Sequence, residues 1–149
     1  MPKISGLDLL RSFKGALDRF AVILMSGHGD IEAAAGSFKA GALDFIEKPF
    51  AAETLFASMD QAIATLAAKL AIVHAKAIID KLSRRERDVL FHIVNGKLSK
   101  TIAHELGIST RTVEMHRANM LTKIGVRSVA EAVRLSILAG PGAASGQDS

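Results

Sequence analysis

Apolar residues between positions 81 and 140 recur every three or four places, which is the spacing of helices that bury one side. Serines that suit helix N-termini open four such stretches, and glycines that suit C-termini close them. The predicted N-caps are Ser83, Ser99, Ser109 and Ser128, and the predicted ends are Asn95-Gly96, Gly107, Gly125 and Gly140. Ser83 and Ser128 are each followed three residues later by a glutamate, so we expect two capping boxes.

The stretch from Ser99 to Gly125 has a short helix, a glycine turn and a longer helix, which is the order of a helix-turn-helix. We expect its apolar side chains to form one cluster, made of Ala103, Leu106, Ile108, Val113, Leu121 and Ile124. The predicted core of this region also includes Val89, Leu90, Ile93, Ile102, Val129, Ala132, Val133 and Leu135.

A further helical pattern runs from about Ala52 to Leu82 without glycine or proline. It predicts one long helix, or two helices with a break near Ala67-Ala68. Residues 66–80 are its predicted linker part. The apolar spacing fits packing within the chain, and it also fits a coiled-coil seam with a second copy.

The first fifty residues change character, because short apolar runs alternate with helical patterns. The order is helix, strand, helix, strand, helix, which predicts a parallel α/β arrangement. The predicted elements are a helix at Gly6–Phe20, a strand at Ala21–Met25, a helix at Ile31–Ala40 capped by Asp30, a strand at Ala42–Ile46 and a helix from Ala51. The uninterrupted apolar run of the first strand predicts burial on both faces. The whole chain is therefore predicted to be mostly α, with a partial α/β segment of two parallel strands.

Charge divides the chain as the patterns do. Residues 1–80 contain 8 Lys and Arg against 9 Asp and Glu, whereas residues 81–149 contain 11 against 6. A basic C-terminal half predicts a polyanion as partner. The final residues, 141–149, are predicted to be a disordered tail.

Several classes of protein are disfavoured. There is no cysteine, which excludes disulfides and thiolate metal sites. The longest apolar stretch carries Lys69, His74 and Lys76, so it is a poor membrane span, and we expect a cytoplasmic protein with no membrane association. No nucleophile–base pair, metal cluster or glycine-rich phosphate loop stands out, so we predict neither an enzyme nor a cofactor.

The punctuated C-terminal stretch, 81–140, resembles the LuxR-type helix-turn-helix domain of FixJ/NarL transcription factors. The resemblance rests on LSRRERDVL at 82–90, Asn95-Gly96, IAHELGIS at 102–109 and RTVEMHR at 111–117. It implies DNA binding through the third helix and pairing through the fourth. The predicted pairing residues are Val129, Val133 and Ile137.

The third of these four helices, predicted between Ser109 and Gly125, is long enough to lie in a major groove, and its N-terminus suits a phosphate. We expect Glu114 to accept a hydrogen bond from cytosine or only to balance a neighbouring arginine. Met115 is expected to pack on a thymine methyl group, and Arg117 to read guanine or clamp a phosphate. The predicted DNA-contacting residues are Ser99, Lys100, Thr110, Arg111, Thr112, Glu114, Met115, Arg117, Ala118 and Lys123.

Residues 1–65 resemble the second half of a response-regulator receiver domain, on VILMSGHGD at 22–30 and FKAGALDFIEKPF at 38–50. The resemblance implies that Ser26 senses a phosphoryl group, that Lys48 pairs with it, that Phe45 is the switch aromatic and that Pro49 follows a cis peptide bond. The phosphoacceptor aspartate of the family would precede Met1, and the acidic pair that holds Mg²⁺ has no counterpart. We therefore expect a truncated receiver with an unpaired apolar strand edge.

The sequence thus predicts a sequence-specific, DNA-binding transcriptional regulator of the two-component type. We expect it to bind double-stranded DNA as a homodimer, and we expect this truncated form not to be phosphorylated. One alternative is an interaction module that forms heterodimers with full-length regulators. Another is a fragment of a phosphoacceptor regulator whose aspartate lies upstream, in which case a sensor histidine kinase or a full-length receiver protein becomes a partner.

Overall fold

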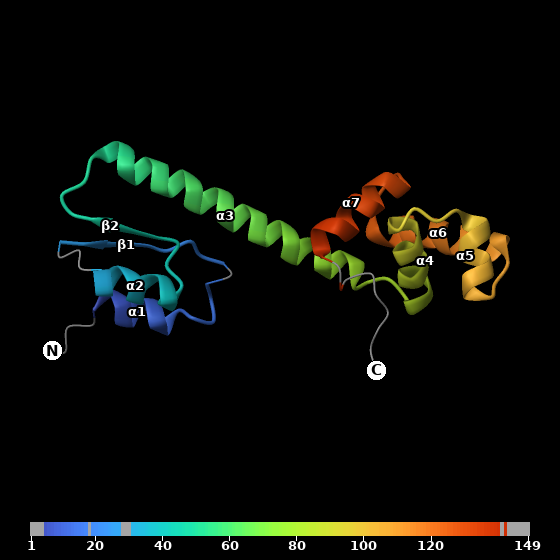
Figure 1. Ribbon diagram of the computed structural model, residues 1–149, viewed down its shortest axis with the longest axis horizontal. Helices are drawn as coiled ribbons and strands as arrows, with labels where there is room; N and C mark the ends of the chain where they lie inside the picture. Colours follow the sequence, from blue (N-terminus) through green and yellow to red (C-terminus); the bar gives the residue numbers. More distant parts are fainter. Residues whose placement is uncertain (1–4, 18, 28–30, 141, 143–149) are drawn as a thin grey trace. The chain divides into compact units, whose positions relative to one another are not determined.

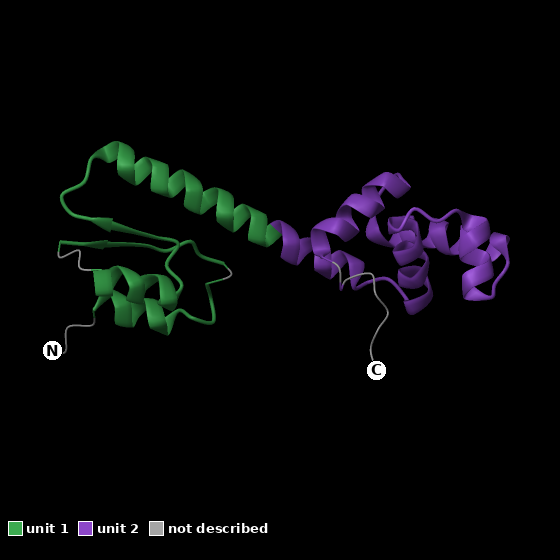
Figure 2. Ribbon diagram, viewed as in Figure 1, with its two compact units in different colours: residues 1–70 green, residues 71–149 purple. Residues whose placement is uncertain are grey.

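The computed structural model describes residues 5–17, 19–27, 31–140 and 142, and it divides into two compact units, residues 1–70 and 71–149 (Figure 2). Helices dominate, and the two strands are parallel, as the sequence predicts. The predicted tail at 141–149 lies outside the described residues apart from Gly142, and so does the predicted cap Asp30.

The first unit is built on a two-stranded parallel sheet (Figure 1). Its elements are α1 (Gly6–Ser12), β1 (Ile23–Ser26), α2 (Ile31–Ala40), β2 (Asp44–Glu47) and the first part of α3 (Ala52–Ile79). The pairing runs from Ile23 opposite Asp44 to Ser26 opposite Glu47. The two strands therefore end at the same edge of the sheet, where the loop after β2 begins.

Two expectations for the first unit were wrong. The first helix ends at Ser12 rather than at Phe20, and the Ser12 hydroxyl donates to the Leu9 carbonyl. Turns follow, in which backbone N–H groups donate to carbonyls three residues earlier. Side-chain bonding of this kind competes with a continuing helix. β1 is half-buried rather than buried on both faces, and Met25 is 43% exposed. In the described part of the chain β1 pairs with β2 alone, which leaves its other edge open as predicted.

Helix α3 is continuous over 28 residues, which resolves the alternatives of one or two helices in favour of one. Its residues belong to both units, and residues Ala75 and Ile79 near its end lie in the core of the second. An 18-residue window of α3 has a mean hydropathy of 1.7, so α3 is long and apolar enough to cross a membrane by length and composition alone. Hydropathy of a single helix is weak evidence, because core helices of globular domains meet the same criterion.

The second unit contains the four predicted helices after the end of α3. They are α4 (Arg84–Val94), α5 (Ser99–Leu106), α6 (Thr110–Ile124) and α7 (Val129–Ala139). Ser83 and Glu86 form the predicted capping box at the start of α4. Ser109 caps α6 by accepting from the Thr112 N–H. These side chains satisfy backbone donors that the first turn of a helix leaves without partners.

Two predicted caps differ. Leu98, not Ser99, is the N-cap of α5, and the Ser99 hydroxyl bonds to side chains on α6 instead. The second capping box is only half formed. Ser128 accepts from the Glu131 N–H, but the Glu131 carboxylate accepts from the N–H of Arg127.

The core of the second unit has two clusters rather than the single predicted one. The smaller lies between α4, α5 and α6 and contains Val89, Ile102, Ala103 and Val113, with Leu106 and Ile108 packed against it. The larger contains Ala75, Ile79, Leu82, Leu90, Met120, Ile124, Ala132 and Ala139, with Leu121 beside it. Ile93 contacts both clusters. The helix-turn-helix is thereby fixed to α3, α4 and α7 through its longer helix.

Candidate nucleic-acid interface

The turn at Gly107 determines how the chain passes from α5 into α6. Gly107 takes the left-handed conformation, with φ of 65°, and its N–H bonds to the carbonyls of Ala103 and His104. The Ile108 N–H then donates to the Ala103 carbonyl at 3.0 Å. A glycine accepts positive φ at little cost, so the chain reverses within a few residues and α6 begins at once.

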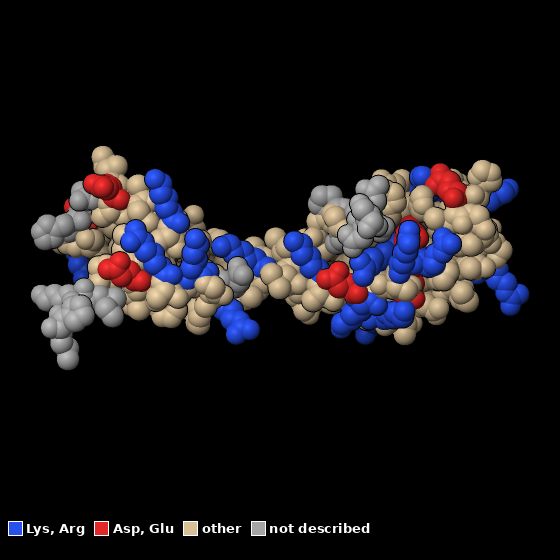
Figure 3. All heavy atoms as spheres, turned by 90° about the horizontal axis from the view of Figure 1, so that it is seen from below, with Lys and Arg blue, Asp and Glu red and all other residues tan. Residues whose placement is uncertain are grey.

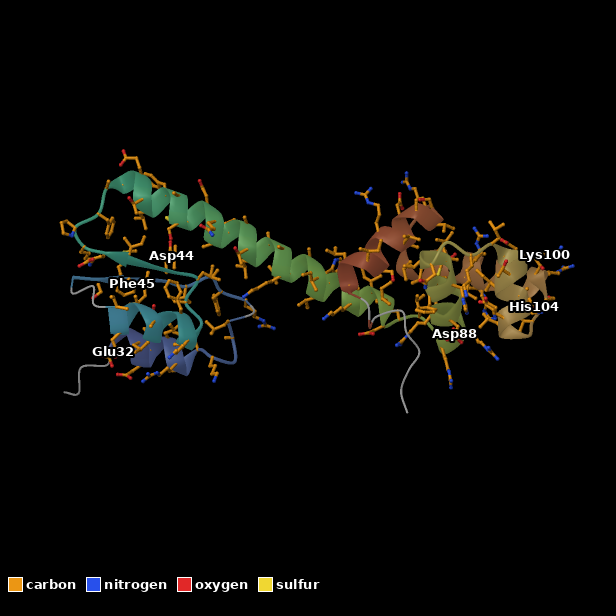
Figure 4. The ribbon with its side chains drawn as sticks, viewed as in Figure 1. Glu32, Asp44, Phe45, Asp88, Lys100 and His104 are labelled. Atoms are coloured by element: carbon orange, nitrogen blue, oxygen red, sulfur yellow. The ribbon has the colours of Figure 1, made fainter. Side chains whose placement is uncertain are left out.

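The predicted DNA-contacting residues occupy the start of α5 and the first two turns and the far end of α6. Most are exposed: Lys100, Thr110, Arg111, Glu114, Met115, Ala118 and Lys123. Three are partly buried, namely Ser99, Thr112 and Arg117. Lys100 and His104 lie one turn apart on α5 in the stick view (Figure 4). The 15 residues of α6 give it a length of about 22 Å, enough to lie along a major groove.

Ser99, Glu114 and Arg117 form a hydrogen-bonded group that the sequence did not predict as a unit. The Ser99 hydroxyl donates to Glu114 Oε1, and Arg117 Nη1 donates to the same oxygen at 3.0 Å and to Ser99 Oγ at 2.8 Å. The Ser99 hydroxyl, followed by the Arg117 guanidinium, holds the pKa of Glu114 below its usual value. Glu114 therefore stays ionised on the exposed face of α6.

Lys123 is held differently from the other basic residues. Its ammonium group donates to Glu86 Oε2 at 2.9 Å, and the Ser83 N–H donates to the same oxygen at 2.8 Å. Only 4% of the Glu86 side chain is exposed, against 46% for Lys123. Glu86 thus joins the start of α4 to the end of α6, a role that sequence reasoning missed because 37 positions separate it from Lys123.

A second polar group was also missed. Lys97 Nζ donates to both carboxylate oxygens of Glu105, at 2.8 and 2.6 Å, and His92 Nδ1 lies 3.1 Å from Glu105 Oε2. Lys97 lowers the pKa of Glu105 by this hydrogen bond. These contacts link α4, the loop after it and α5.

Basic side chains outnumber acidic ones over the second unit. The space-filling view shows lysine and arginine side chains gathered on one face of it, with a few acidic groups among them (Figure 3). Among the described residues, Arg111 and Lys100 form no ion pair. This arrangement can bring several cations to a phosphate backbone.

The outer part of α7 forms a surface hollow of about 600 Å³, lined by Val126, Glu131, Arg134, Leu135, Ile137 and Leu138. Ile137, a predicted pairing residue, is 65% exposed, whereas Val129 and Val133 are partly buried. The hollow therefore presents apolar side chains between one carboxylate and one guanidinium.

Of the predicted switch residues, Ser26, Lys48 and Pro49 lie where the two strands end, whereas Phe45 lies near the start of β2, opposite Leu24. Ser26 ends β1, and the Lys48 N–H donates to its carbonyl at 2.7 Å. The peptide bond between Lys48 and Pro49 is cis, as predicted. Phe45 is partly buried on β2 beside Asp44 (Figure 4). No group of three or more acidic or histidine side chains that could hold a metal occurs within the described ranges.

Comparison with known families matches residues 80–136 to "Bacterial regulatory proteins, luxR family" and residues 1–60 to "Response regulator receiver domain". The chain is 44% identical to the transcriptional regulatory protein FixJ of Azorhizobium caulinodans, over 94% of this chain and 68% of that protein. It is 40% identical to FixJ of Rhizobium meliloti, over 95% of this chain and 72% of that protein. The solved structure of the response regulator StyR shares 33% identity, with a TM-score of 0.63 over 92% of this chain and 71% of that one.

Proposed function

Because the chain belongs to the FixJ/NarL-type response regulators, with receiver and LuxR-type DNA-binding regions, we propose that it binds specific double-stranded DNA sequences as a dimer. It is a transcriptional regulator by its family, and such regulators are generally not enzymes. The observation that carries the proposal is the exposed face of α6, where Arg111, Glu114 and Met115 stand free of the core that the rest of the helix joins.

The face of α6 is suited to the major groove in both shape and chemistry. The N-cap Ser109 leaves the first turn, with Thr110 and Arg111, at the positive end of the helix dipole. Glu114 and Met115 follow at the second turn, where an acceptor and an apolar group can meet base edges. Lys100 on α5 and Lys123 at the end of α6 add cations for phosphates.

Selection of binding sequences from random duplexes, followed by titration at several salt concentrations, tests this proposal. We expect one enriched motif and an affinity that falls steeply with salt, because phosphate contacts release counterions. Arg111→Ala should weaken binding to all sequences and reduce the salt slope by about 1. Arg85→Ala, on an exposed part of α4, is the matched control and should leave both unchanged. Absence of any enriched motif would refute sequence-specific binding.

Dimerisation is proposed through the outer face of α7. Response regulators with LuxR-type domains generally act as dimers, and Ile137 lies exposed in an apolar hollow. Isologous contact would place two copies of Val129, Val133 and Ile137 together and would let a pair of domains read two half-sites. Ile137→Asp should lower the dimer fraction in analytical ultracentrifugation and weaken binding to a two-half-site duplex, while a single half-site is bound as before.

For the chain as it stands we propose no phosphorylation. Ser26 and Lys48 occupy their expected edge, but no acidic cluster accompanies them among the described residues, and phosphoryl transfer to a carboxylate needs both the carboxylate and a metal. After incubation with acetyl phosphate and Mg²⁺, the intact mass of the protein should show no added phosphoryl group. Uptake of phosphate would restore the reading in which a sensor kinase is a partner.

Heterodimerisation with a full-length regulator is the second candidate function. It is favoured by the open edge of β1 and by the exposed side chains of Met25 and Phe38 in the first unit. Co-purification with a receiver protein, together with no enriched DNA motif, would select it. We retain a cytoplasmic location and no membrane association as part of the main proposal.

A further inference from the structure

The side chains of Ser99, Glu114 and Arg117 form a closed triangle of hydrogen bonds between α5 and α6. The Ser99 hydroxyl donates to Glu114 Oε1 at 2.5 Å, and Arg117 Nη1 donates to both of its partners. Ser99 lies at the first position of α5, while the other two residues are one turn apart on α6. The triangle therefore ties a side chain on the exposed face of α6 to the preceding helix.

The three members differ in exposure. The Glu114 side chain is 54% exposed, whereas that of Arg117 is 30% exposed and its Nε is buried without a hydrogen-bond partner among the described residues. Both donors of the triangle reach Oε1 of Glu114, and Oε2 accepts no hydrogen bond in the same part of the chain. Arg117 is thus turned to its protein partners, and the second carboxylate oxygen of Glu114 is left as an acceptor.

An isolated carboxylate beside DNA phosphates is repelled by them, and a flexible one loses rotamer freedom when it binds. The guanidinium of Arg117 compensates the charge locally, and the bond from Ser99 restrains the carboxylate before DNA arrives. A restrained acceptor in a major groove suits an exocyclic amino group, and carboxylates pair with cytosine N4 there.

We propose that Ser99 and Arg117 are positioning residues that hold the Glu114 carboxylate on α6 so that its Oε2 reads the amino group of a cytosine. This rests on the proposed DNA binding and deepens it. It assigns Arg117 to Glu114 rather than to a guanine, and it assigns Ser99 to the same base pair rather than to a phosphate or to a helix cap.

The test measures affinity of the full chain for the selected duplex and for duplexes changed at each base pair in turn. Glu114→Ala should abolish preference at one C·G pair and leave the other positions as in the wild type. Ser99→Ala should reduce preference at that same pair by about tenfold, the lower part of the range for such contacts. Ser99→Thr, which keeps the hydroxyl, should retain it.

Three further measurements distinguish a positioning role of Ser99 from a purely structural one. The double variant Ser99→Ala/Glu114→Ala should match Glu114→Ala, because the hydroxyl acts through the carboxylate. Ser99→Ala and Ser99→Thr should unfold at similar temperatures, although only Ser99→Thr keeps the base preference. The salt slope of Ser99→Ala should equal that of the wild type, since no phosphate contact is removed.

Opposite results overturn the inference at distinct levels. Wild-type protein without sequence preference overturns the proposed function and this assignment together. Wild-type preference that survives Ser99→Ala unchanged overturns the assignment alone. A uniform loss of affinity with a smaller salt slope makes Ser99 a phosphate contact, and unchanged preference in Glu114→Ala removes the carboxylate as a reader.

Discussion

The two units of the chain differ in how completely each buries its own apolar side chains. The second unit buries large side chains completely, among them Ile79, Leu90, Ile102 and Met120. The first unit buries Leu10, Ala42, Ile46 and Ala62. It leaves many large apolar side chains exposed, namely Leu9, Phe13, Phe20, Met25, Ile31, Phe38, Phe56, Met59, Ile63 and Leu70. Side chains cap helices in both units, at Ser5 in the first and at Ser83, Ser109 and Ser128 in the second, so the units differ in burial rather than in capping.

This contrast separates a rigid reading surface from a surface built for contact. Fully buried side chains in two clusters fix one arrangement of α4 to α7, which a base-reading helix requires. Apolar side chains left exposed around a two-stranded sheet mark a region that gains stability by covering them. The predictions below compare matched positions in the two units.

Core truncation should give the largest difference between the units. Leu90 is fully buried in the larger cluster of the second unit, while Met25 on β1 is 43% exposed. Leu90→Ala should cost about 2–5 kcal/mol of unfolding free energy, because it removes apolar contacts and leaves a cavity. Met25→Ala should cost under about 1 kcal/mol, since little burial is lost. Urea titration followed by circular dichroism measures both. Equal losses would break the distinction.

The sequence predicts the second unit well because its signals are local. Apolar spacing, a serine at each helix start and glycine at each end define α4 to α7 within a few residues. Gly107 and Gly125 take the left-handed conformation that such ends need. Ser99 was misjudged because its hydroxyl serves a group 15 and 18 positions away, and local pattern carries no information on such contacts.

Met120 is a different omission: it is fully buried and lies four positions before Ile124 and seven after Val113, on the same face of α6, so the helical spacing predicts it although it was left out of the predicted core. At the site the limit is again distance along the chain. The ion pair of Glu86 with Lys123 joins residues 37 positions apart. In the first unit, the apolar run of β1 predicts a strand but not its neighbours, so burial on both faces was inferred wrongly.

Loss of the Glu86 carboxylate should give the next largest effect. Glu86→Ala leaves the Lys123 ammonium and the Ser83 N–H without their shared acceptor, and we expect a cost of about 2 kcal/mol. Glu32→Ala, in the exposed first turn of α2, is the matched change in the first unit and should cost under about 0.5 kcal/mol. A similar loss for the two variants would contradict a specific role for Glu86.

The pH dependence of stability sharpens the same test. Burial raises the pKa of Glu86, but hydrogen bonds from Lys123 and Ser83 outweigh this, and the pKa lies below its ordinary value. The carboxylate therefore contributes stability above the ordinary pKa of about 4.3, and the contribution is lost as pH falls through the lowered value. In the wild type the unfolding free energy should fall as the pH is lowered from 5 to 3 (approximately one pH unit on either side of that pKa). This fall should be smaller in Glu86→Gln and unchanged in Glu32→Gln.

Backbone geometry at the turn of the helix-turn-helix should give the smallest of these effects. Gly107→Ala places a side chain at φ of 65°, where open space surrounds the new Cβ but the left-handed conformation costs about 1 kcal/mol. Gly27, directly after β1, has no positive φ and no atom within 4 Å of a Cβ, so Gly27→Ala should change stability by under about 0.5 kcal/mol. Because the strain lies in the backbone between α5 and α6, Gly107→Ala should also weaken DNA binding slightly at all base pairs, whereas Gly27→Ala should leave it unchanged. A stability loss for Gly27→Ala equal to that for Gly107→Ala would show that conformation at the turn is not what distinguishes these positions.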